Sequence, residues 1–244
     1  MDLALINLDR TPDRLAAFAR ANAHLPAVKR YAAVDGRALD TGALIADGLI
    51  TADILATYTQ GSIGAACSHI GLWGIAAQAD RAVTILEDDA VLHKDFCPTA
   101  DALVAALPND WDIVLWGWNF DSYLLFELLP GVSNCLAAFD QEQMRAGLAA
   151  FQTAPVSPHL FRLQRAFGCP CYSVSAKGAA KLRRHCIPLR AMSVFFPGLN
   201  RTVPNNGIDI MMNDAYPRLQ AYVSFPPLAV TANRVEIRTS QQRD

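Results

Sequence analysis

Short apolar runs separated by polar breaks recur along the chain and predict a series of buried strands. Runs of roughly four to eight apolar, often β-branched residues are typical of strands inside a sheet. The expected strands cover residues 3–6, 29–37, 83–86, 111–118, 167–174 and 221–227. We expect the last of these at a sheet edge, because it ends in prolines that cannot donate to a strand ladder.

Between these strands the spacing of apolar residues changes to that of helices. Pro12 follows Thr11, a pair typical of a helix start with threonine as the cap. Ser175 begins another helix in the same way, and residues 64–79 and 96–107 carry apolar stripes at helical spacing. A helix that leads into a strand through a short connection is typical of parallel sheets. We therefore expect an α/β, Rossmann-like fold with a mostly parallel central sheet and helices on both faces.

Two segments follow neither pattern over their whole length. Residues 122–165 combine an apolar run, a helical stretch at 141–151 and two prolines. Long irregular stretches in compact domains are usually functional or mobile, so we expect a lid or an acceptor-side insertion. The polar tail from residue 234 is expected to fray.

Composition limits the kinds of protein that this chain can be. The 244 residues are 52% hydrophobic and 18% charged, which suits one well-packed domain over residues 1–244. The formal net charge is -2, so there is no general basic surface for nucleic acid, and we expect no nucleic-acid partner.

Cysteine usage and the N-terminus indicate the compartment. The six cysteines form no C-x-x-C pair and are expected to be reduced, mostly buried thiols, as in a cytoplasmic protein. The first residues lack a basic segment followed by a long apolar run, so we expect no signal peptide. No stretch approaches the ~18 apolar residues of a membrane span, which leaves peripheral membrane contact.

Three consecutive carboxylates, Glu87, Asp88 and Asp89, follow the expected strand at 83–86. Ligands of open α/β sheets bind at the carboxyl ends of the strands. Adjacent carboxylates repel one another, and a divalent cation relieves this repulsion. Mg²⁺ and Mn²⁺ prefer oxygen ligands and often also hold substrate phosphates. The alternative is a solvated acidic turn.

Polar residues near other strand ends could reach the same edge. The loop after the first strand carries Asn7 and Asp9, with Arg14 on the following helix, at a position where nucleotides commonly bind. No glycine-rich phosphate motif is present, so side chains would have to provide this binding. Asp121 follows the strand at 111–118, and a local turn bond is its alternative role. His69 lies inside the helix at 64–79, where a core histidine is the alternative.

Several short motifs occur together in a recognisable order. They cover residues 6–10 with Arg14, 33–36, 64–73, 86–90, 111–114, 172–179 and 208–209. In this order and spacing the chain resembles glycosyltransferase family 25, which includes bacterial lipooligosaccharide galactosyltransferases and collagen galactosyltransferases. The resemblance spans most of the chain, but residues 116–165 match no motif, so the acceptor is not inherited.

The resemblance implies a GT-A fold, a nucleotide-sugar donor and a metal-binding acidic motif. That motif corresponds to Glu87, Asp88 and Asp89, with Asp89 as the first-choice ligand for Mn²⁺ or Mg²⁺. The implied donor half covers about residues 1–120 and the acceptor half about 121–244. The donor-binding residues implied are Asn7, Asp9, Arg14, Asp35, Gly36, Ser68 and His69.

Family members that invert the anomeric centre need a general base for the acceptor hydroxyl. Asp209 and Asp121 are the candidates, and Asp209 is preferred because it lies in a matching motif; a helix cap is its alternative role. The expected reaction moves a sugar such as galactose from a UDP-sugar to a cell-envelope glycan or lipid-linked acceptor at the inner membrane face. A metal-dependent nucleotidyltransferase or phosphohydrolase, and a non-catalytic nucleotide-sugar-binding domain, are the alternatives. The oligomeric state stays open.

Overall fold

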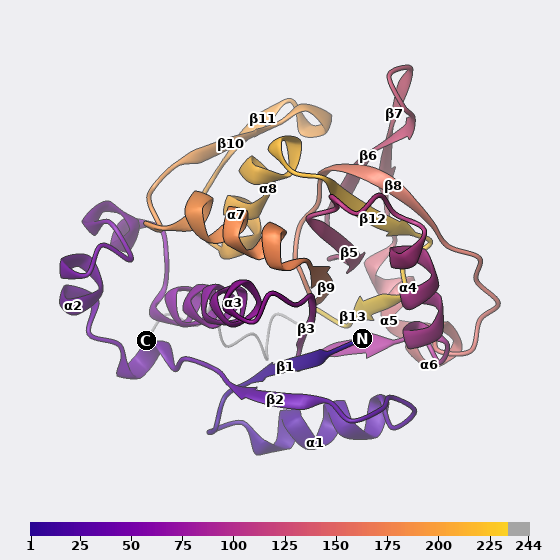
Figure 1. Ribbon diagram of the computed structural model, residues 1–244, viewed down its shortest axis with the longest axis horizontal. Coiled ribbons are helices and arrows are strands. Elements are labelled where there is room, and N and C mark those ends of the chain that lie inside the picture. The colour runs from indigo at the N-terminus through magenta and orange to yellow at the C-terminus, as the bar shows by residue number, and fades with distance from the viewer. Residues whose placement is uncertain (234–244) are drawn as a thin grey trace.

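The computed structural model describes residues 1–233, and within them a nine-stranded sheet is the centre of the fold (Figure 1). The expectation for the tail from residue 234 lies outside the described residues. The strand order is β2-β1-β3-β9-β5-β12-β8-β6-β7. In chain order these strands are β1 (Leu3–Asn7), β2 (Lys29–Ala32), β3 (Val83–Glu87), β5 (Ile113–Gly117), β6 (Tyr123–Leu129), β7 (Ser133–Ala138), β8 (His159–Arg165), β9 (Cys171–Val174) and β12 (Ala221–Phe225).

Two small antiparallel pairs accompany this sheet. They are β4 (Ala90–Leu92) with β13 (Ala229–Thr231), and β10 (Ser193–Phe196) with β11 (Arg201–Pro204). Because β13 pairs with β4, the end of the described chain lies beside the segment that follows β3. The second pair forms a hairpin that the sequence patterns did not predict.

The helices of the described residues lie mostly between strands, as the sequence patterns predict. They are α1 (Pro12–Ala21), α2 (Thr41–Ala46), α3 (Gln60–Gln78), α4 (Phe96–Ala105), α5 (Gln141–Ala146), α6 (Leu148–Phe151), α7 (Ala176–Cys186) and α8 (Ile208–Ala215), with 3-10 segments η1 (Gly36–Ala38), η2 (Ala52–Ala56), η3 (Pro197–Leu199) and η4 (Tyr216–Arg218). Thr59 caps α3 by accepting from the backbone N–H of Ser62 at 3.0 Å, so this helix starts before the predicted residue 64. Thr11 precedes α1 as predicted, but its side chain does not cap the helix.

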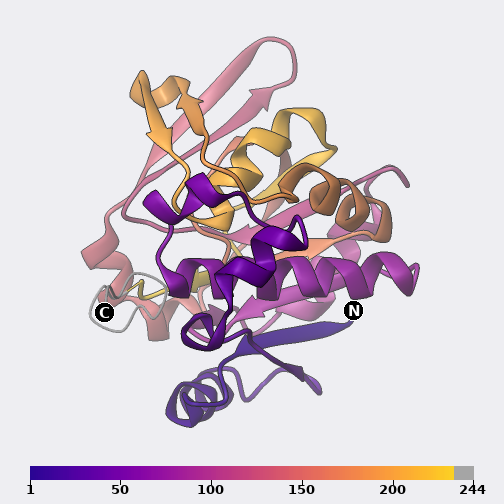
Figure 2. The same ribbon diagram turned by 90° about the vertical axis from the view of Figure 1, so that its left-hand side faces the viewer.

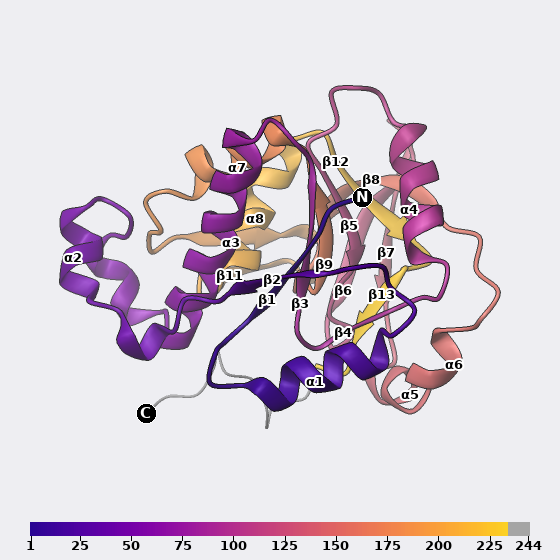
Figure 3. The same cartoon turned by 60° about the horizontal axis from the view of Figure 1, so that its bottom comes forward.

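Alternation along the central strands divides the apolar residues between two cores. On β5, Ile113 and Leu115 face the core under α3 and α7, whereas Val114 and Trp116 face the core under α1 and α4. The same period of two holds on β3 and β9, because successive side chains of a strand point to opposite faces. Helices therefore cover both faces, as predicted (Figure 3).

The prediction of a mostly parallel sheet needs correction at the level of strand pairs. Six of the nine strands run in one direction, but only β1–β2, β1–β3 and β5–β12 are parallel neighbours. The other neighbouring pairs are antiparallel. The crossover from β3 through α4 to β5 leaves room for one strand, and β9 fills it in the opposite direction.

Two further expectations were wrong. Strand β12 lies inside the sheet between β5 and β8; Pro226 and Pro227 follow its last ladder residue, so no ladder donor is lost. Residues 122–165 are not an irregular insertion, since they supply three strands of the central sheet and the helices α5 and α6.

Two hairpins, β6–β7 and β10–β11, project from the same end of the molecule (Figure 2). They are in contact, since a side chain at Gly198 would meet the Leu136 side chain at 2.5 Å. Beneath them Tyr123, Phe196 and Phe167 form an aromatic cluster. Across residues 1–233, the helices are all too short or too polar to cross a bilayer.

Candidate active site

The carboxyl ends of β1, β3 and β5 meet the start of the antiparallel strand β9 at one edge of the sheet. A cavity of about 470 Å³ opens along this edge. The predicted site residues that line it are Asn7, Arg14, Gly36, Ser68, His69, Glu87, Asp88, Asp89, Asp121 and Asp209. Residues from both halves of the chain thus share one cavity.

Asp9 and Asp35 are the predicted donor-binding residues that do not line this cavity. The Asp9 carboxylate is 80% exposed and pairs with Arg30. Asp35 accepts from Arg10 Nε at 2.7 Å and from the backbone N–H of Arg37, and the Arg10 bond holds the pKa of that carboxyl below its usual value. Arg10 does line the cavity, so of the Arg10–Asp35 ion pair only the arginine contributes to the site.

Asp88 is held by two donors from the first strand and the first helix. Asn7 Nδ2 donates to Oδ2 at 2.7 Å, and Arg14 Nε donates to Oδ1 at 2.8 Å. Burial alone would lower the pKa of Arg14, but the hydrogen bond and charge of Asp88 raise it. Asn7 is held in turn by Arg30, whose Nε donates to Oδ1 at 3.0 Å. Asp88 is thereby a charge-paired carboxylate that orients Arg14.

Asp89 differs from its neighbour because one of its oxygens has no partner. Oδ1 is buried and makes no hydrogen bond with the described residues. Arg14 Nη2 lies 3.9 Å from Oδ2. Burial and the nearby charge of Glu87 raise the pKa of Asp89 to about 6. A buried carboxylate oxygen without a donor fits a divalent cation, because a cation would replace the missing partner and stabilise the ionised form.

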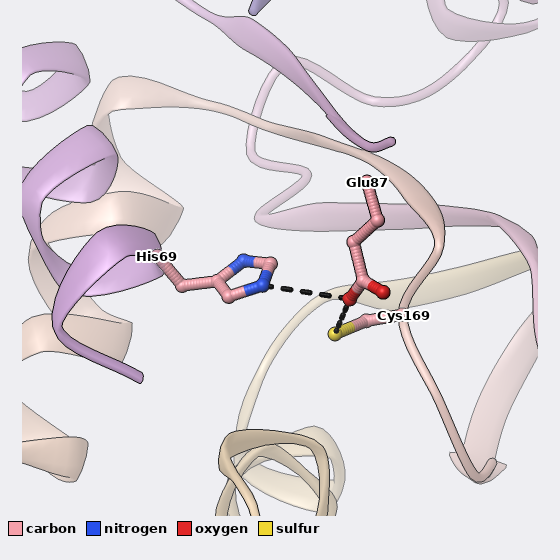
Figure 4. Close-up of side chains that lie close together, drawn as sticks. All are labelled: His69, Glu87 and Cys169. Carbon is pink, nitrogen blue, oxygen red and sulfur yellow. Dashed lines mark hydrogen bonds and ion pairs between the residues drawn. The ribbon is translucent and has the colours of Figure 1, made fainter. Parts of the chain in front are cut away.

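The Glu87 carboxylate points toward His69 and Cys169 (Figure 4). Its Oε1 lies 3.5 Å from His69 Nε2 and 3.5 Å from Cys169 Sγ. Burial opposes ionisation of Glu87, but the hydrogen bond with His69 outweighs it and lowers the pKa of the carboxyl. The three consecutive acids therefore do not converge on one point, and among them only Asp89 has a buried oxygen without a hydrogen-bond partner among the described residues.

His69 is held in place from behind. Its Nδ1 lies 2.8 Å from the Tyr172 hydroxyl, and Trp73 Nε1 donates to the same oxygen at 2.8 Å. The ring is buried, which agrees with the core role considered for it, yet its Nε2 faces a carboxylate at the cavity. Cys169 and Tyr172 were missed as site residues, because the pattern of residues 167–174 indicates only an apolar strand.

Ser68 and Gly36 shape the cavity wall. Ser68 Oγ donates to the Gly64 carbonyl at 2.8 Å and accepts from the Val34 backbone N–H at 2.9 Å. A side chain at Gly36 would meet the Gln60 carbonyl oxygen at 1.9 Å. Both residues hold the turn after β2 against the start of α3, so their contacts are structural.

Asp209 and Asp121, the two candidate bases, both line the cavity. Asp209 Oδ2 accepts from the backbone N–H of Gly168 at 2.9 Å. Burial raises the pKa of Asp209, and the charge of Glu87 adds to this. Asp121 is exposed and accepts from Asn233 Nδ2 at 2.7 Å.

The last described residues contribute side chains that sequence reasoning missed. Thr231 lines the cavity beside Asp89, and Asn233 Nδ2 donates to Asp121. Strand β13 pairs with β4 directly beyond the acidic residues, and this pairing brings the end of the described chain to the site. The apolar run of β13 was the sequence feature that could have indicated it.

Of three comparisons with known proteins, one identifies a family and the other two add little. A search of curated proteins finds no match. The A197 crystal structure from STIV shares 9% identity, with a TM-score of 0.40, over 91% of this chain and 81% of that one. The apo crystal structure of mouse xyloside xylosyltransferase 1 shares 10% identity, with a TM-score of 0.38, over 91% and 71%.

The family comparison is specific. The model of glycosyltransferase family 25 (LPS biosynthesis protein) matches residues 1–194, a range that contains the strand ends, the acidic residues and Cys169. Asp209 and the closing strand pair lie beyond it. Since this match covers well over half of the sequence, the chain is a glycosyltransferase and belongs to family 25.

Proposed function

We propose that this enzyme transfers a sugar from a UDP-sugar to a cell-envelope glycan or lipid-linked acceptor in a metal-dependent, inverting reaction. The observation that carries the proposal is the unpartnered buried oxygen of Asp89, beside the Arg14 cation, in a cavity of about 470 Å³. Family membership favours sugar transfer over nucleotidyl transfer, phosphate hydrolysis or binding without turnover.

Charge around the cavity suits a diphosphate. Arg10 and Arg14 line it, and so do Gly61 and Ser62 in the first turn of the 19-residue helix α3. The N-terminus of a helix carries partial positive charge and attracts phosphate. Asp89 would hold Mn²⁺ or Mg²⁺. The ion would neutralise charge that develops on the departing nucleoside diphosphate.

Asp209 is the proposed base. It faces the same cavity from α8, and its raised pKa makes it a better proton acceptor than an ordinary aspartate. The Gly168 N–H orients its Oδ2, and the acceptor hydroxyl would donate to this carboxylate. Asp121 is the second candidate, since it lines the same cavity.

The two projecting hairpins are the proposed contact with the membrane that carries a lipid-linked acceptor. Val132 is 80% exposed, and Leu129, Leu136 and Phe195 are about half exposed. Residues 128–139 and 191–200 contain no charged side chain. Arginines at positions 190 and 201 flank the second segment, which suits an anionic lipid surface.

The test is a thermal-shift and turnover screen of nucleotide sugars with and without Mn²⁺. We expect UDP and one UDP-sugar to raise the melting temperature only with the metal, and that UDP-sugar to release UDP. Absence of a shift with every UDP-sugar at saturating Mn²⁺ would contradict the donor assignment. Release of phosphate from simple nucleotides would favour a phosphohydrolase.

A further inference from the structure

Three side chains with different ligand atoms meet at the floor of the cavity. They come from separate elements: His69 from α3, Glu87 from the end of β3 and Cys169 from the connection between β8 and β9. One ligand atom of each lies within 4.8 Å of the other two. Among residues 1–233 no other set of three histidine, cysteine or acidic side chains comes together in this way.

We propose that His69, Glu87 and Cys169 form a transition-metal site of the zinc class, separate from the Mg²⁺ or Mn²⁺ site at Asp89. Imidazole nitrogen, carboxylate oxygen and thiolate sulfur are the ligands of Zn²⁺, whereas Mg²⁺ and Mn²⁺ prefer oxygen alone. The proposal concerns metal binding and is independent of sugar transfer.

The spacing needs little adjustment to surround an ion. Ligand bonds of about 2.0–2.3 Å in a tetrahedral arrangement separate neighbouring ligand atoms by roughly 3.3–3.6 Å. Glu87 Oε1 already lies 3.5 Å from both His69 Nε2 and Cys169 Sγ. All three residues line the cavity, so the fourth ligand position faces water or a small ligand.

The surroundings support His69 as a ligand. A metal at Nε2 requires the proton on Nδ1, and Nδ1 lies 2.8 Å from the Tyr172 oxygen. That oxygen can accept from Nδ1 and from Trp73 Nε1 together, since a phenol has two lone pairs. Such a partner on the second ring nitrogen is the usual arrangement behind a metal-bound histidine.

Charge balance also supports the site. Binding releases the thiol proton of Cys169 to solvent, and the resulting thiolate and the Glu87 carboxylate neutralise a dication. Asp209 is an acid close to Cys169 that lies outside both proposed ligand sets, and its charge adds attraction for a cation. Arg14, whose charge also reaches Glu87, is paired with Asp88.

Cobalt(II) is the probe, because its absorption spectrum reports both sulfur ligation and tetrahedral geometry. The full-length protein is freed of metal with a chelator and titrated with Co²⁺. We expect one equivalent to produce a sulfur-to-cobalt charge-transfer band and the intense visible bands of a tetrahedral ion. Zn²⁺ should bleach both, and excess Mg²⁺ or Mn²⁺ should not.

Variants assign the ligands. Cys169→Ser should abolish the charge-transfer band, and His69→Gln should weaken Co²⁺ binding at least about tenfold. Tyr172→Phe should keep the band and weaken binding by ~10–100-fold. Cys97→Ser, on α4 in the other core, and Asp89→Asn should both leave the band intact.

Thermal melts of each variant in the presence of the chelator show whether the metal-free variant is folded. If Cys169→Ser does not fold, Cys169→Ala takes its place. A wild-type protein without the band would overturn the proposal, and so would a band that survives in a folded Cys169→Ser protein. Loss of the band in Asp89→Asn would mean one shared site instead of two. Failure of the sugar-transfer assay would leave all these readouts in place.

Discussion

The Arg14 guanidinium and the Asp88 carboxylate are joined by a hydrogen bond of 2.8 Å from Nε to Oδ1, and Asn7 occupies the second carboxylate oxygen at 2.7 Å. Asp88 therefore has both oxygens engaged. Its neighbour Asp89 has a buried oxygen without a partner. Asp88 thus belongs to a structural ion pair, whereas Asp89 offers a free ligand position.

Replacing these two acids should have different effects. Asp89→Ala should remove the Mn²⁺-dependent rise in melting temperature with UDP. Asp88→Asn should keep that rise but lower the free energy of unfolding by about 1–3 kcal/mol, because Arg14 loses its charged partner. Thermal and urea melts with and without UDP and Mn²⁺ measure both. The opposite pattern would make Asp88 the metal ligand.

The raised pKa of Asp89 predicts opposite pH dependences for the metal-free protein and for its metal-bound form. The folded pKa, about 6, lies above the unfolded value, so the folded state holds the proton more tightly. Without metal, stability should fall as pH rises from ~4 to ~6. Stabilisation by Mn²⁺ requires the ionised form, so it should be complete above about pH 6 and be lost as pH falls through it. Asp89→Asn is the control that should show neither transition.

Asp209→Asn should separate binding from turnover. Donor affinity should stay near that of the wild type, while kcat should fall by ~10²–10⁴ because no base remains for the acceptor hydroxyl. Since burial raises the pKa of Asp209, the acid limb of the wild-type rate should lie above that of an ordinary aspartate. Asp121→Asn is the matched variant from the same cavity; a larger loss of kcat there would reverse the two roles.

Gly36→Ala should destabilise the protein. The added methyl group would lie 1.9 Å from the Gln60 carbonyl oxygen, and a backbone atom cannot move aside as a side chain can. We expect the free energy of unfolding to drop by about 3 kcal/mol or more in urea titrations. Gly42→Ala is the control, because its methyl group meets only the Asp40 carboxylate, at 3.2 Å. Equal stability of the two variants would show that the turn at Gly36 can shift.

The hairpin surface should bind anionic vesicles. Flotation with phosphatidylglycerol vesicles should recover the wild type, and the double variant Leu129→Asp with Val132→Asp should stay in solution. Ile75→Asp replaces an apolar side chain that is 52% exposed on α3, and it should float like the wild type. Equal flotation of all three proteins, or none for the wild type, would contradict the membrane role.

The parts of the fold that depend on local pattern could be predicted from the sequence. Strands β1, β3 and β5 are apolar runs with polar ends, α1 begins with Pro12, and Ser175 precedes α7 as its N-cap. The direction of β9 and the central place of β12 could not be predicted, since both depend on which distant strands are left unpaired. Period-two patterns identify a strand but not its neighbours.

The candidate site shows the same division. The acidic residues were found because three charges after a buried strand are unusual. The partners of these acids could not be found in the same way, because they are distant in the sequence. Arg14 lies 74 positions from Asp88, and Cys169 lies 82 positions from Glu87. Thr231 and Asn233 reach the site only because β13 pairs with β4.

Strand β9 has a consequence for biosynthesis. It is the sole connection between β3 and β5 in the sheet, yet residues 171–174 are translated more than fifty positions after β5 ends. On the ribosome, the amino-terminal half must wait with two strand edges open, where newly made chains are most prone to associate wrongly. A fragment ending near residue 120 should therefore aggregate when expressed alone, and rescue should require the missing strand to be supplied.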